Sequence, residues 1–401
     1  MDTRPKHLEL ISEIQTLLTR NDAASRKHAA ARSRALTTAL ETPEETAVQI
    51  SFMVLCTRLA IDLRLFIIVT EHRSVITAEE VATKSGGEKL LIIRIMRVLS
   101  LIGFVDEVAE QQWIATPITI AMTQPAIEGS HKHLWDMTFG TAAKIPEYMH
   151  KYGYKSPTSL DGGPLQYAFG TNLTCFEYCS SKPNTLEDFN NMMTGIRHSR
   201  PSWVEWFPVY EQLLKGYRDD TILLVDIGGG WGHDVVAFRQ KFGPDAKLGL
   251  QDLPHVVSQA PLLPSNIEIV GYNFLIDDQP MKGNHNGILQ VVSLINLAGA
   301  RAYFFHFVFH DWPDDKCLQI FRHTASAMKK GYSKILLNEY VLRDFGCSMA
   351  PAMMDINMLT LCSGLERSEK QWRELVKKAG LRIVNIWRPE GDTEAVIEIE
   401  L

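Results

Sequence analysis

The stretch TILLVDIGGGWGHD, residues 221–234, decides the fold of this 401-residue chain. A run of aliphatic residues is followed by four glycines at positions 228–230 and 232. Aliphatic and β-branched residues favour a buried strand, whereas glycine permits positive φ angles and lets another molecule approach the main chain closely. A strand, a glycine turn and a helix hold nucleotide-like ligands in doubly wound proteins. We therefore expect such a ligand at residues 228–230.

The C-terminal part repeats this strand-and-helix pattern. Apolar runs that suit strands alternate with amphipathic segments and read, in order, TILLVDIG, KLGLQD, IEIVGYNF, RAYFFHFVFH, KILLNEYVL, LRIVNIW and EAVIEIE. Because the first five runs are separated by helical segments, they predict parallel neighbours in one sheet. The expected fold class is α/β, with a Rossmann-like, mostly parallel sheet.

The N-terminal part is helical in pattern. Residues 76–117 read as helix, turn, helix and hairpin, which is typical of a winged helix. Its second helix, EKLLIIRIMRVLSLIG at 88–103, has few side chains that could read bases or bind phosphates. The net charge of −6 is also unusual for a nucleic-acid-binding protein. We expect a scaffold that packs on another subunit, and no nucleic-acid partner.

The chain divides into four expected parts. They are a helical arm at 1–45, a winged-helix domain at 46–125, a helical connector and pocket wall at 126–220, and the sheet domain at 221–401.

Composition limits where the protein works. No run of eighteen uncharged apolar residues is present, so we expect no membrane span. The N-terminus has no hydrophobic signal region, and the six cysteines form no CxxC pair. These features predict an intracellular, cytoplasmic protein with free thiols and no Cys/His metal site.

Two aspartates narrow the ligand of the glycine turn. Asp226 ends the first strand-like run and Asp252 ends the second. A carboxylate at the second position can bind both ribose hydroxyls. No basic cluster follows to receive a pyrophosphate, and no GxxxxGK[ST] motif is present. An adenosine without phosphates fits, which predicts S-adenosylmethionine.

Five motifs together resemble one enzyme family. LLVDIGGGWGHD, LQDLPHV, FHFVFHDWPDDKC, ILLNEYVL and MLTLCSGLERSEKQW are similar, in order and spacing, to the class II O-methyltransferases of the caffeate and flavonoid type. The similarity spans about residues 45–401 and is greatest to fungal secondary-metabolism members. It implies a homodimer joined by the winged-helix domain, and a small phenolic or polyketide-type substrate.

The resemblance also implies roles for individual residues. Cofactor contacts fall on Gly228, Gly229 and Gly230 for the methionine portion, Asp252 for the ribose, and Asn273 and Phe274 for the adenine. Asn273 stands where the family has an acidic residue, and His306 stands where the plant enzymes have a lysine.

The catalytic residues implied by the family are His310, Glu339 and Glu366. A phenol has a pKa near 10, so it is mostly neutral at pH 7 and needs a base. A positioned imidazole supplies roughly 10²–10⁴-fold by accepting that proton. The expected substrate pocket includes His133, Arg197, Asp355 and Met358.

Two other functions stay open at this stage. A related pericyclase would bind the cofactor without moving a methyl group, and His133 and Arg197 are the residues that favour it. A non-catalytic regulator would use the winged helix. The negative net charge of the chain and its complete set of expected active-site residues argue against this function.

One segment departs from the family pattern. Removing residues 284–298, NHNGILQVVSLINLA, restores the family spacing between the third and fourth strands. The segment is either a surface insertion or the translation of an unspliced intron.

Overall fold

The computed structural model describes residues 6–40, 43–198, 200–243, 245–260, 262–281, 299–389 and 394–401. The insertion at 284–298 and the side chain of Arg197 lie outside this description. The chain forms two compact units, Met1–Asp136 with Lys182–Ile196, and Met137–Ser181 with Arg197–Leu401. The four expected parts therefore remain a prediction about domains.

The first unit is mainly helical. Its elements are α1 (Lys6–Thr19), α2 (Ala23–Leu40), α3 (Pro43–Asp62), α4 (Leu65–His72), β1 (Ile76–Thr77), α5 (Ala78–Ser85), α6 (Lys89–Leu101), β2 (Val105–Ala109), β3 (Gln112–Ala115), α7 (Pro117–Ala121), α8 (Pro125–His133) and α13 (Pro183–His198).

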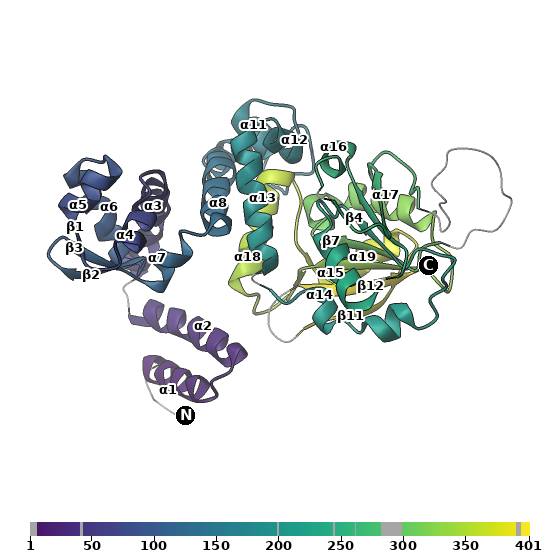
Figure 1. The fold of residues 1–401 in the computed structure, drawn as a ribbon, viewed down its shortest axis with the longest axis horizontal. Coiled ribbons are helices and arrows are strands. Elements are labelled where there is room, and N and C mark those ends of the chain that lie inside the picture. The colour runs from purple at the N-terminus through teal and green to yellow at the C-terminus, as the bar shows by residue number, and fades with distance from the viewer. Residues whose placement is uncertain are drawn as a thin grey trace. The chain divides into compact units, whose positions relative to one another are not determined.

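Helices α4, α5 and α6 gather around a small antiparallel sheet of order β1-β3-β2 (Figure 1). Thr77 caps the start of helix α5: its side chain accepts a hydrogen bond from the Glu80 N–H, while the Thr77 N–H donates to the Glu80 carboxylate at 2.9 Å. This reciprocal cap satisfies donors that a helix start leaves unpaired. The elements follow the expected helix, turn, helix and hairpin, and the winged-helix assignment stays a prediction.

Short helices lead into the second unit. They are η1 (Leu134–Phe139), α9 (Gly140–Ala142), α10 (Ile145–Tyr152), α11 (Pro164–Phe169), α12 (Cys175–Ser180), α14 (Trp203–Trp206) and η2 (Tyr210–Leu214). Among the described residues, no helix has the length and apolar character needed to cross a membrane.

The second unit is built on a seven-stranded sheet of order β11-β12-β8-β7-β4-β5-β6. Its strands are β4 (Leu224–Ile227), β5 (Leu248–Asp252), β6 (Ile267–Gly271), β7 (Ala302–His306), β8 (Lys334–Glu339), β11 (Arg382–Trp387) and β12 (Ala395–Glu400). The first five pair in parallel, and β11 and β12 are antiparallel. The predicted α/β class and mostly parallel sheet are confirmed.

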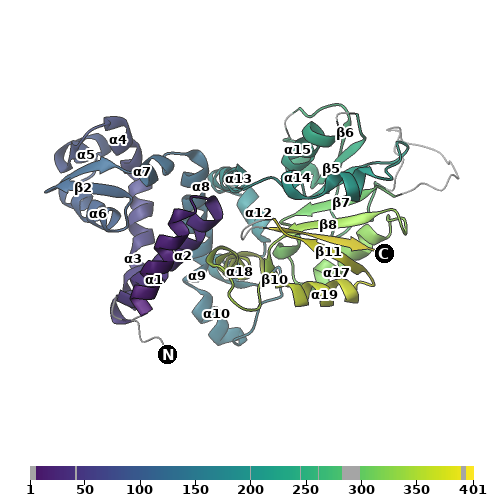
Figure 2. The same ribbon diagram turned by 90° about the horizontal axis from the view of Figure 1, so that it is seen from below.

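Helices cover both faces of this sheet. The remaining elements are α15 (His233–Phe242), α16 (Pro254–Val257), η3 (Phe309–Asp311), α17 (Asp314–Ala325), β9 (Val341–Leu342), α18 (Met349–Cys362), β10 (Arg367–Ser368) and α19 (Glu369–Lys378). One core cluster joins the strands to α17 and α19, which lie side by side in Figure 2, and another joins them to α14 and α15. Strands buried on both faces need the continuous apolar runs seen in the sequence.

The parallel pairing brings five strand ends to one edge of the sheet. Strands β4, β5, β6, β7 and β8 end at Ile227, Asp252, Gly271, His306 and Glu339. In open α/β sheets, ligands bind outside the carboxyl ends of the strands. The expected cofactor and catalytic residues of this unit therefore meet at or just after this edge.

Candidate active site

The glycine loop after β4 combines positive φ angles with close contacts. Gly228 and Gly230 have φ of 70° and 59°. A Cβ on Gly228 would lie 2.8 Å from Val308 Cγ2, and one on Gly229 would lie 2.6 Å from the carboxyl carbon of Asp226. A Cβ on Gly230 would meet nothing within 4 Å. The loop is thus tightly packed on its inner side and has open space at Gly230.

The carboxylate of Asp252 fastens this loop. Its Oδ2 accepts a hydrogen bond from the Gly230 N–H at 2.8 Å, and its Oδ1 accepts one from the Leu253 N–H at 2.7 Å. Burial raises the pKa of Asp252. The two backbone N–H donors act in the opposite direction, because they stabilise the ionised carboxylate. Asp226, by contrast, is fully buried and accepts from the Val235 N–H at 3.2 Å, which ties the loop to α15.

The next strand ends carry the other expected cofactor residues. His306 Nδ1 lies 2.9 Å from Asp234 Oδ2, while its Nε2 is buried with no hydrogen-bond partner among the described residues. Asn273 Oδ1 accepts from the Leu275 N–H at 3.0 Å. The ring of Phe274 packs edge-on against Trp312, with centroids 5.9 Å apart.

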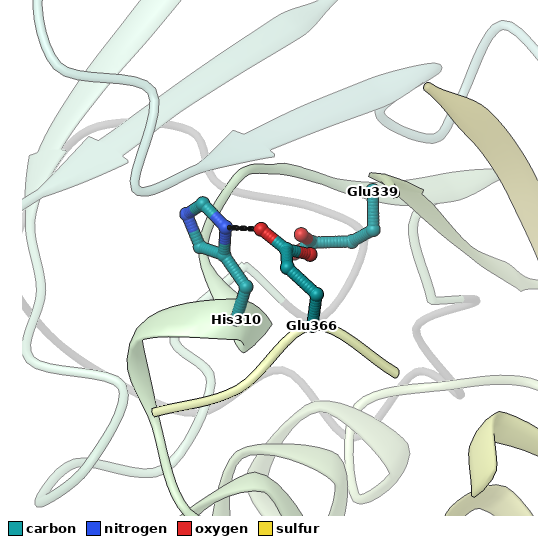
Figure 3. A group of neighbouring side chains, drawn as sticks. All are labelled: His310, Glu339 and Glu366. Carbon is teal, nitrogen blue, oxygen red and sulfur yellow. Dashed lines mark hydrogen bonds and ion pairs between the residues drawn. The ribbon is translucent and has the colours of Figure 1, made fainter. Parts of the chain in front are cut away.

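His310 lies in a single 3₁₀ turn after β7 and is buried. Its Nδ1 is 2.7 Å from Glu366 Oε1. Figure 3 shows the imidazole directed at this carboxylate, with Glu339 beside the pair. If this hydrogen bond holds a proton on Nδ1, then Nε2 is the nitrogen that can exchange a proton with a substrate. Asp311 Oδ1 is 3.5 Å from Nε2.

Glu339 stands close to this pair but binds the backbone. Its Oε1 accepts from the Val308 N–H at 3.0 Å and the Phe309 N–H at 2.7 Å, which are the first donors of the turn. The two glutamates, which the sequence motifs present as equivalent, thus make different contacts. Glu366 hydrogen-bonds the imidazole, and Glu339 holds the turn that carries it.

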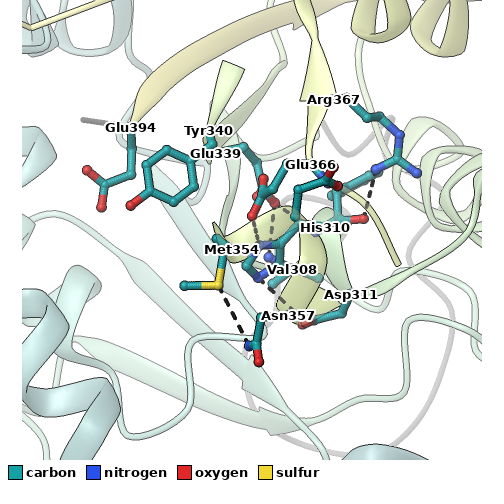
Figure 4. Close-up of polar contacts among 12 residues, drawn as sticks. Val308, His310, Asp311, Glu339, Tyr340, Met354, Asn357, Glu366, Arg367 and Glu394 are labelled. Carbon is teal, nitrogen blue, oxygen red and sulfur yellow. Dashed lines mark hydrogen bonds and ion pairs between the residues drawn. The ribbon is translucent and has the colours of Figure 1, made fainter. Parts of the chain in front are cut away.

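Arg367 completes the support of the turn, a role that the sequence motifs did not predict. Its fully buried guanidinium donates to the Phe309 and Trp312 carbonyls at 3.1 and 2.9 Å, and it pairs with Asp314 (Figure 4). The His310 carbonyl itself accepts from the Leu365 N–H at 3.0 Å. The position of Arg367 directly after Glu366 in GLERSEKQW was the only signal that the sequence offered.

The buried carboxyl groups control the charge of the site. Burial alone would lower the pKa of His310, but Glu366, Asp311 and Glu339 outweigh it and raise the pKa to about 10. Burial raises the pKa of Glu339 to about 7 and that of Asp311 to about 6. The three neighbouring carboxyl groups therefore favour the protonated imidazole.

The same three residues have the composition of a small metal site. Ligand atoms of His310, Glu339 and Glu366 lie within 4.8 Å of one another. Glu339 Oε1 and His310 Nδ1 each already take part in a hydrogen bond within the protein. These contacts favour a role for the trio as a hydrogen-bonded base over a role as metal ligands. The expectation of no metal remains to be tested by chelation.

The expected pocket residues have varied surroundings. Asp355 Oδ1 accepts from the Glu366 N–H at 2.8 Å, so it helps to place that glutamate, and Met358 is buried. His133 belongs to the first unit, where it is buried against Phe189 with ring centroids 5.3 Å apart. Burial lowers the pKa of His133 to about 4, and its Nδ1 has no hydrogen-bond partner among the described residues.

Comparisons with known proteins identify close sequence and structural relatives. Residues 158–382 match the O-methyltransferase domain family. The "O-methyltransferase penC" of Penicillium thymicola is 38% identical over 371 residues, 92% of this chain and 89% of that protein. The demethylsterigmatocystin 6-O-methyltransferase of Aspergillus flavus is 30% identical over 341 residues, 85% of this chain and 83% of that protein.

Two similar solved structures bear the titles "The structure of LepI complex with SAM" and "A Pericyclic Reaction enzyme". Each is 27% identical with a TM-score of 0.84, and each alignment covers 98% of both chains.

Proposed function

This chain belongs to the O-methyltransferase family and is a methyltransferase that uses S-adenosylmethionine, and from that premise we propose that it methylates a hydroxyl of a small aromatic or polyketide-type secondary metabolite with His310 as general base. The observation that carries the proposal is the buried pair of His310 and Glu366, 2.7 Å apart, after the strand next to the glycine loop.

The glycine loop and Asp252 fit the cofactor. S-adenosylmethionine supplies, when bound, a methyl group activated by a positively charged sulfonium. Gly230 leaves open space beside the Asp252 carboxylate, and the buried Nε2 of His306 can still accept or donate a hydrogen bond. We assign the cofactor contacts to these residues and to Gly228, Gly229, Asn273 and Phe274, with Asp226 supporting the loop from behind.

No metal is needed in this assignment. Calorimetry of S-adenosylmethionine binding, with and without a chelator, tests it. We expect equal affinities, and a chelator-sensitive affinity would give His310, Glu339 and Glu366 a metal-binding role instead.

The base strength of His310 suits a phenolic substrate. A phenol has a pKa of about 10, and an imidazole of ordinary pKa would accept its proton at a cost of about 5 kcal/mol. With the His310 pKa at about 10, the transfer from a phenol to neutral Nε2 is nearly balanced. The same pKa keeps most of His310 protonated at pH 7, so the active, neutral fraction grows as the pH rises. Glu366 stabilises the imidazolium that forms, as the carboxylate behind a catalytic histidine does elsewhere.

Rigidity of the turn supports the same chemistry. Methyl transfer requires the hydroxyl oxygen to be held in line with the methyl group, and such positioning contributes about 7–11 kcal/mol. Glu339 binds the first two N–H groups of the turn, and Arg367 binds the carbonyls on either side of His310. The base is therefore held before any substrate arrives.

The direct test is turnover with a panel of phenols and polyketide-type acceptors. We expect S-adenosylhomocysteine and an O-methylated product in equal amounts. The variant His323→Ala, which removes a largely buried imidazole whose Nδ1 lies 3.2 Å from Asp278 Oδ1, serves as the histidine control and should keep the wild-type rate. Cofactor binding without methylation of any acceptor would contradict the proposal.

A pericyclase is the second candidate. The solved structure titled as a pericyclic reaction enzyme is the observation that favours it. This reaction would convert a substrate while consuming no S-adenosylmethionine. Measuring product and S-adenosylhomocysteine in one reaction separates the two functions.

We also propose a cytoplasmic homodimer, joined through residues 1–125, with no nucleic-acid partner. Exposed apolar side chains of the first unit support the dimer, among them Leu18, Leu90 and Leu101. The six cysteines are free, as suits a reducing compartment. Sedimentation as a monomer at micromolar concentration would contradict the dimer, and retention on DNA at physiological salt would contradict the absence of a nucleic-acid partner.

A further inference from the structure

Phe307 has an unusual backbone conformation at the end of β7. It is a non-glycine residue with φ of 52°, in the left-handed region, and its N–H donates to the Asn338 carbonyl at 3.2 Å. Such a conformation is unfavourable for a bulky residue and persists where surrounding contacts require it. The chain thus keeps an aromatic side chain at a position where glycine would be less strained.

The aromatic side chain of Phe307 stacks on the base. Its ring lies nearly parallel to the imidazole of His310, with centroids 5.1 Å apart and planes at 16°. Parallel aromatic rings at this separation attract each other, and an aromatic face also attracts a cation. The charged groups that act on His310 are Glu366, Asp311 and Glu339, and Phe307 adds an uncharged face.

Other side chains hold Phe307 in place. The guanidinium carbon of Arg200 is 5.6 Å from the Phe307 ring centroid and 5.1 Å from that of Tyr340. Arg200 also pairs with Glu394 and donates to the Tyr340 hydroxyl. Figure 4 shows Tyr340 and Glu394 in the same neighbourhood as His310. A half-buried, ion-paired cluster therefore fixes the ring that stacks on the base.

We propose that Phe307 is a positioning residue for His310: its ring holds the imidazole by stacking and stabilises the imidazolium formed when His310 accepts the substrate proton. This inference rests on the proposed role of His310 as general base. Phe307 touches neither the proton nor the methyl group, and it acts through the orientation and the charge of the imidazole.

The test compares Phe307→Leu with Phe307→Tyr. Leucine removes the aromatic face, so we expect kcat to fall about 10-fold. This is less than the cost of about 10²-fold for a misplacement of ~1 Å, because Glu366 still hydrogen-bonds His310 Nδ1. The affinity for S-adenosylmethionine should stay the same. In ¹³C-labelled histidine NMR of the ligand-free protein, the pKa of His310 should fall by about 0.5 to 1 unit, which lies between the effects of an exposed and a desolvated cation–π contact. Tyrosine should restore both values.

Phe242→Leu is the matched control. Phe242 also has an aromatic neighbour, Phe238 at 5.8 Å, and a cation, Lys241 at 5.4 Å from its ring, but it ends α15. This variant should keep the kcat and the His310 pKa of the wild type.

The outcomes separate the two proposals. If His310→Ala is inactive while Phe307→Leu keeps the wild-type kcat and His310 pKa, the stacking role is wrong and the base stands. If His310→Ala methylates at the wild-type rate, the base itself is wrong. A loss of stability in Phe307→Leu without a change in the His310 pKa would assign Phe307 a packing role only.

Discussion

The glycine loop after β4 and the turn after β7 that carries His310 follow adjacent parallel strands but are built in opposite ways. The loop takes its shape from backbone conformation, with φ of 70° and 59° at two of its glycines. One carboxylate, that of Asp252, holds it through a hydrogen bond from a loop N–H. The turn takes its shape from buried side chains contributed by β8, β10 and the residue before β10.

This difference assigns separate tasks to neighbouring segments. A loop with open space at Gly230 can admit a ligand, and its defects should appear in binding. A turn held through the Val308 and Phe309 N–H groups, three of its carbonyls and His310 Nδ1 is well fixed, and its defects should appear in the chemical step. Variants in the two segments can therefore test the comparison directly.

The largest expected effect is that of His310→Ala. Loss of the base should lower kcat by about 10²–10⁴-fold, the usual worth of a positioned base. The dissociation constant for S-adenosylmethionine should change little, because the loop and Asp252 are intact. Activity should recover in part at high pH, where the phenol ionises unaided. Calorimetry and steady-state kinetics measure the two effects. An equal loss of cofactor affinity and rate would contradict the assignment of binding to the loop and of chemistry to the turn.

The same contrast explains what the sequence predicted and what it did not. The strands and the glycine loop depend on local patterns, namely continuous apolar runs and consecutive glycines, and the structure has both where the sequence places them. The catalytic trio was predicted from family motifs, but their separate contacts were not. Arg367 and Phe307 act on His310 through tertiary packing and an unusual φ, which no periodicity encodes.

Gly228→Ala should have the next largest effect, on binding. The new Cβ would lie 2.8 Å from Val308 in a backbone conformation that alanine adopts only at a cost of about 1–2 kcal/mol. We expect the dissociation constant for S-adenosylmethionine to rise roughly 10-fold or more.

Gly216→Ala is the control for Gly228→Ala. Gly216 has φ of 84°, and a Cβ there would meet nothing within 4 Å. This variant should lose stability in thermal unfolding only through its strained backbone, and it should keep its cofactor affinity. Equal affinity losses in both variants would mean that the loop acts only through stability.

Glu366→Gln should shift the pH dependence of the reaction. In the wild type, kcat/KM for the acceptor should rise with pH toward about 10, as His310 loses its proton. Removal of the Glu366 charge lowers the His310 pKa, so the rise should occur at lower pH and reach a lower plateau, about 10-fold below the wild type. An unchanged pH profile would show that Glu366 does not set the strength of the base.

The same substitution should change stability in a defined pH range. The His310 pKa is higher in the folded protein than its ordinary value of 6.5, so its contribution is complete below pH 6.5 and is lost as the pH rises through about 10. Denaturant unfolding of the wild type should therefore show this loss between those values. Glu366→Gln should flatten it, whereas His323→Ala should not.

The smallest expected effect is that of Asn273→Asp, which restores the acidic residue found at this place in the family. Asn273 Oδ1 already accepts from the Leu275 N–H, and a carboxylate can keep that bond, so the fold should not change. If this residue contacts the adenine, a charged acceptor strengthens one hydrogen bond, and the affinity for S-adenosylmethionine should rise about 3-fold to 10-fold. The increase should be smaller for a cofactor analogue that lacks the adenine amino group. The same increase with both ligands would place Asn273 away from the adenine and restrict the binding role to the glycine loop, Asp252 and the remaining strand ends.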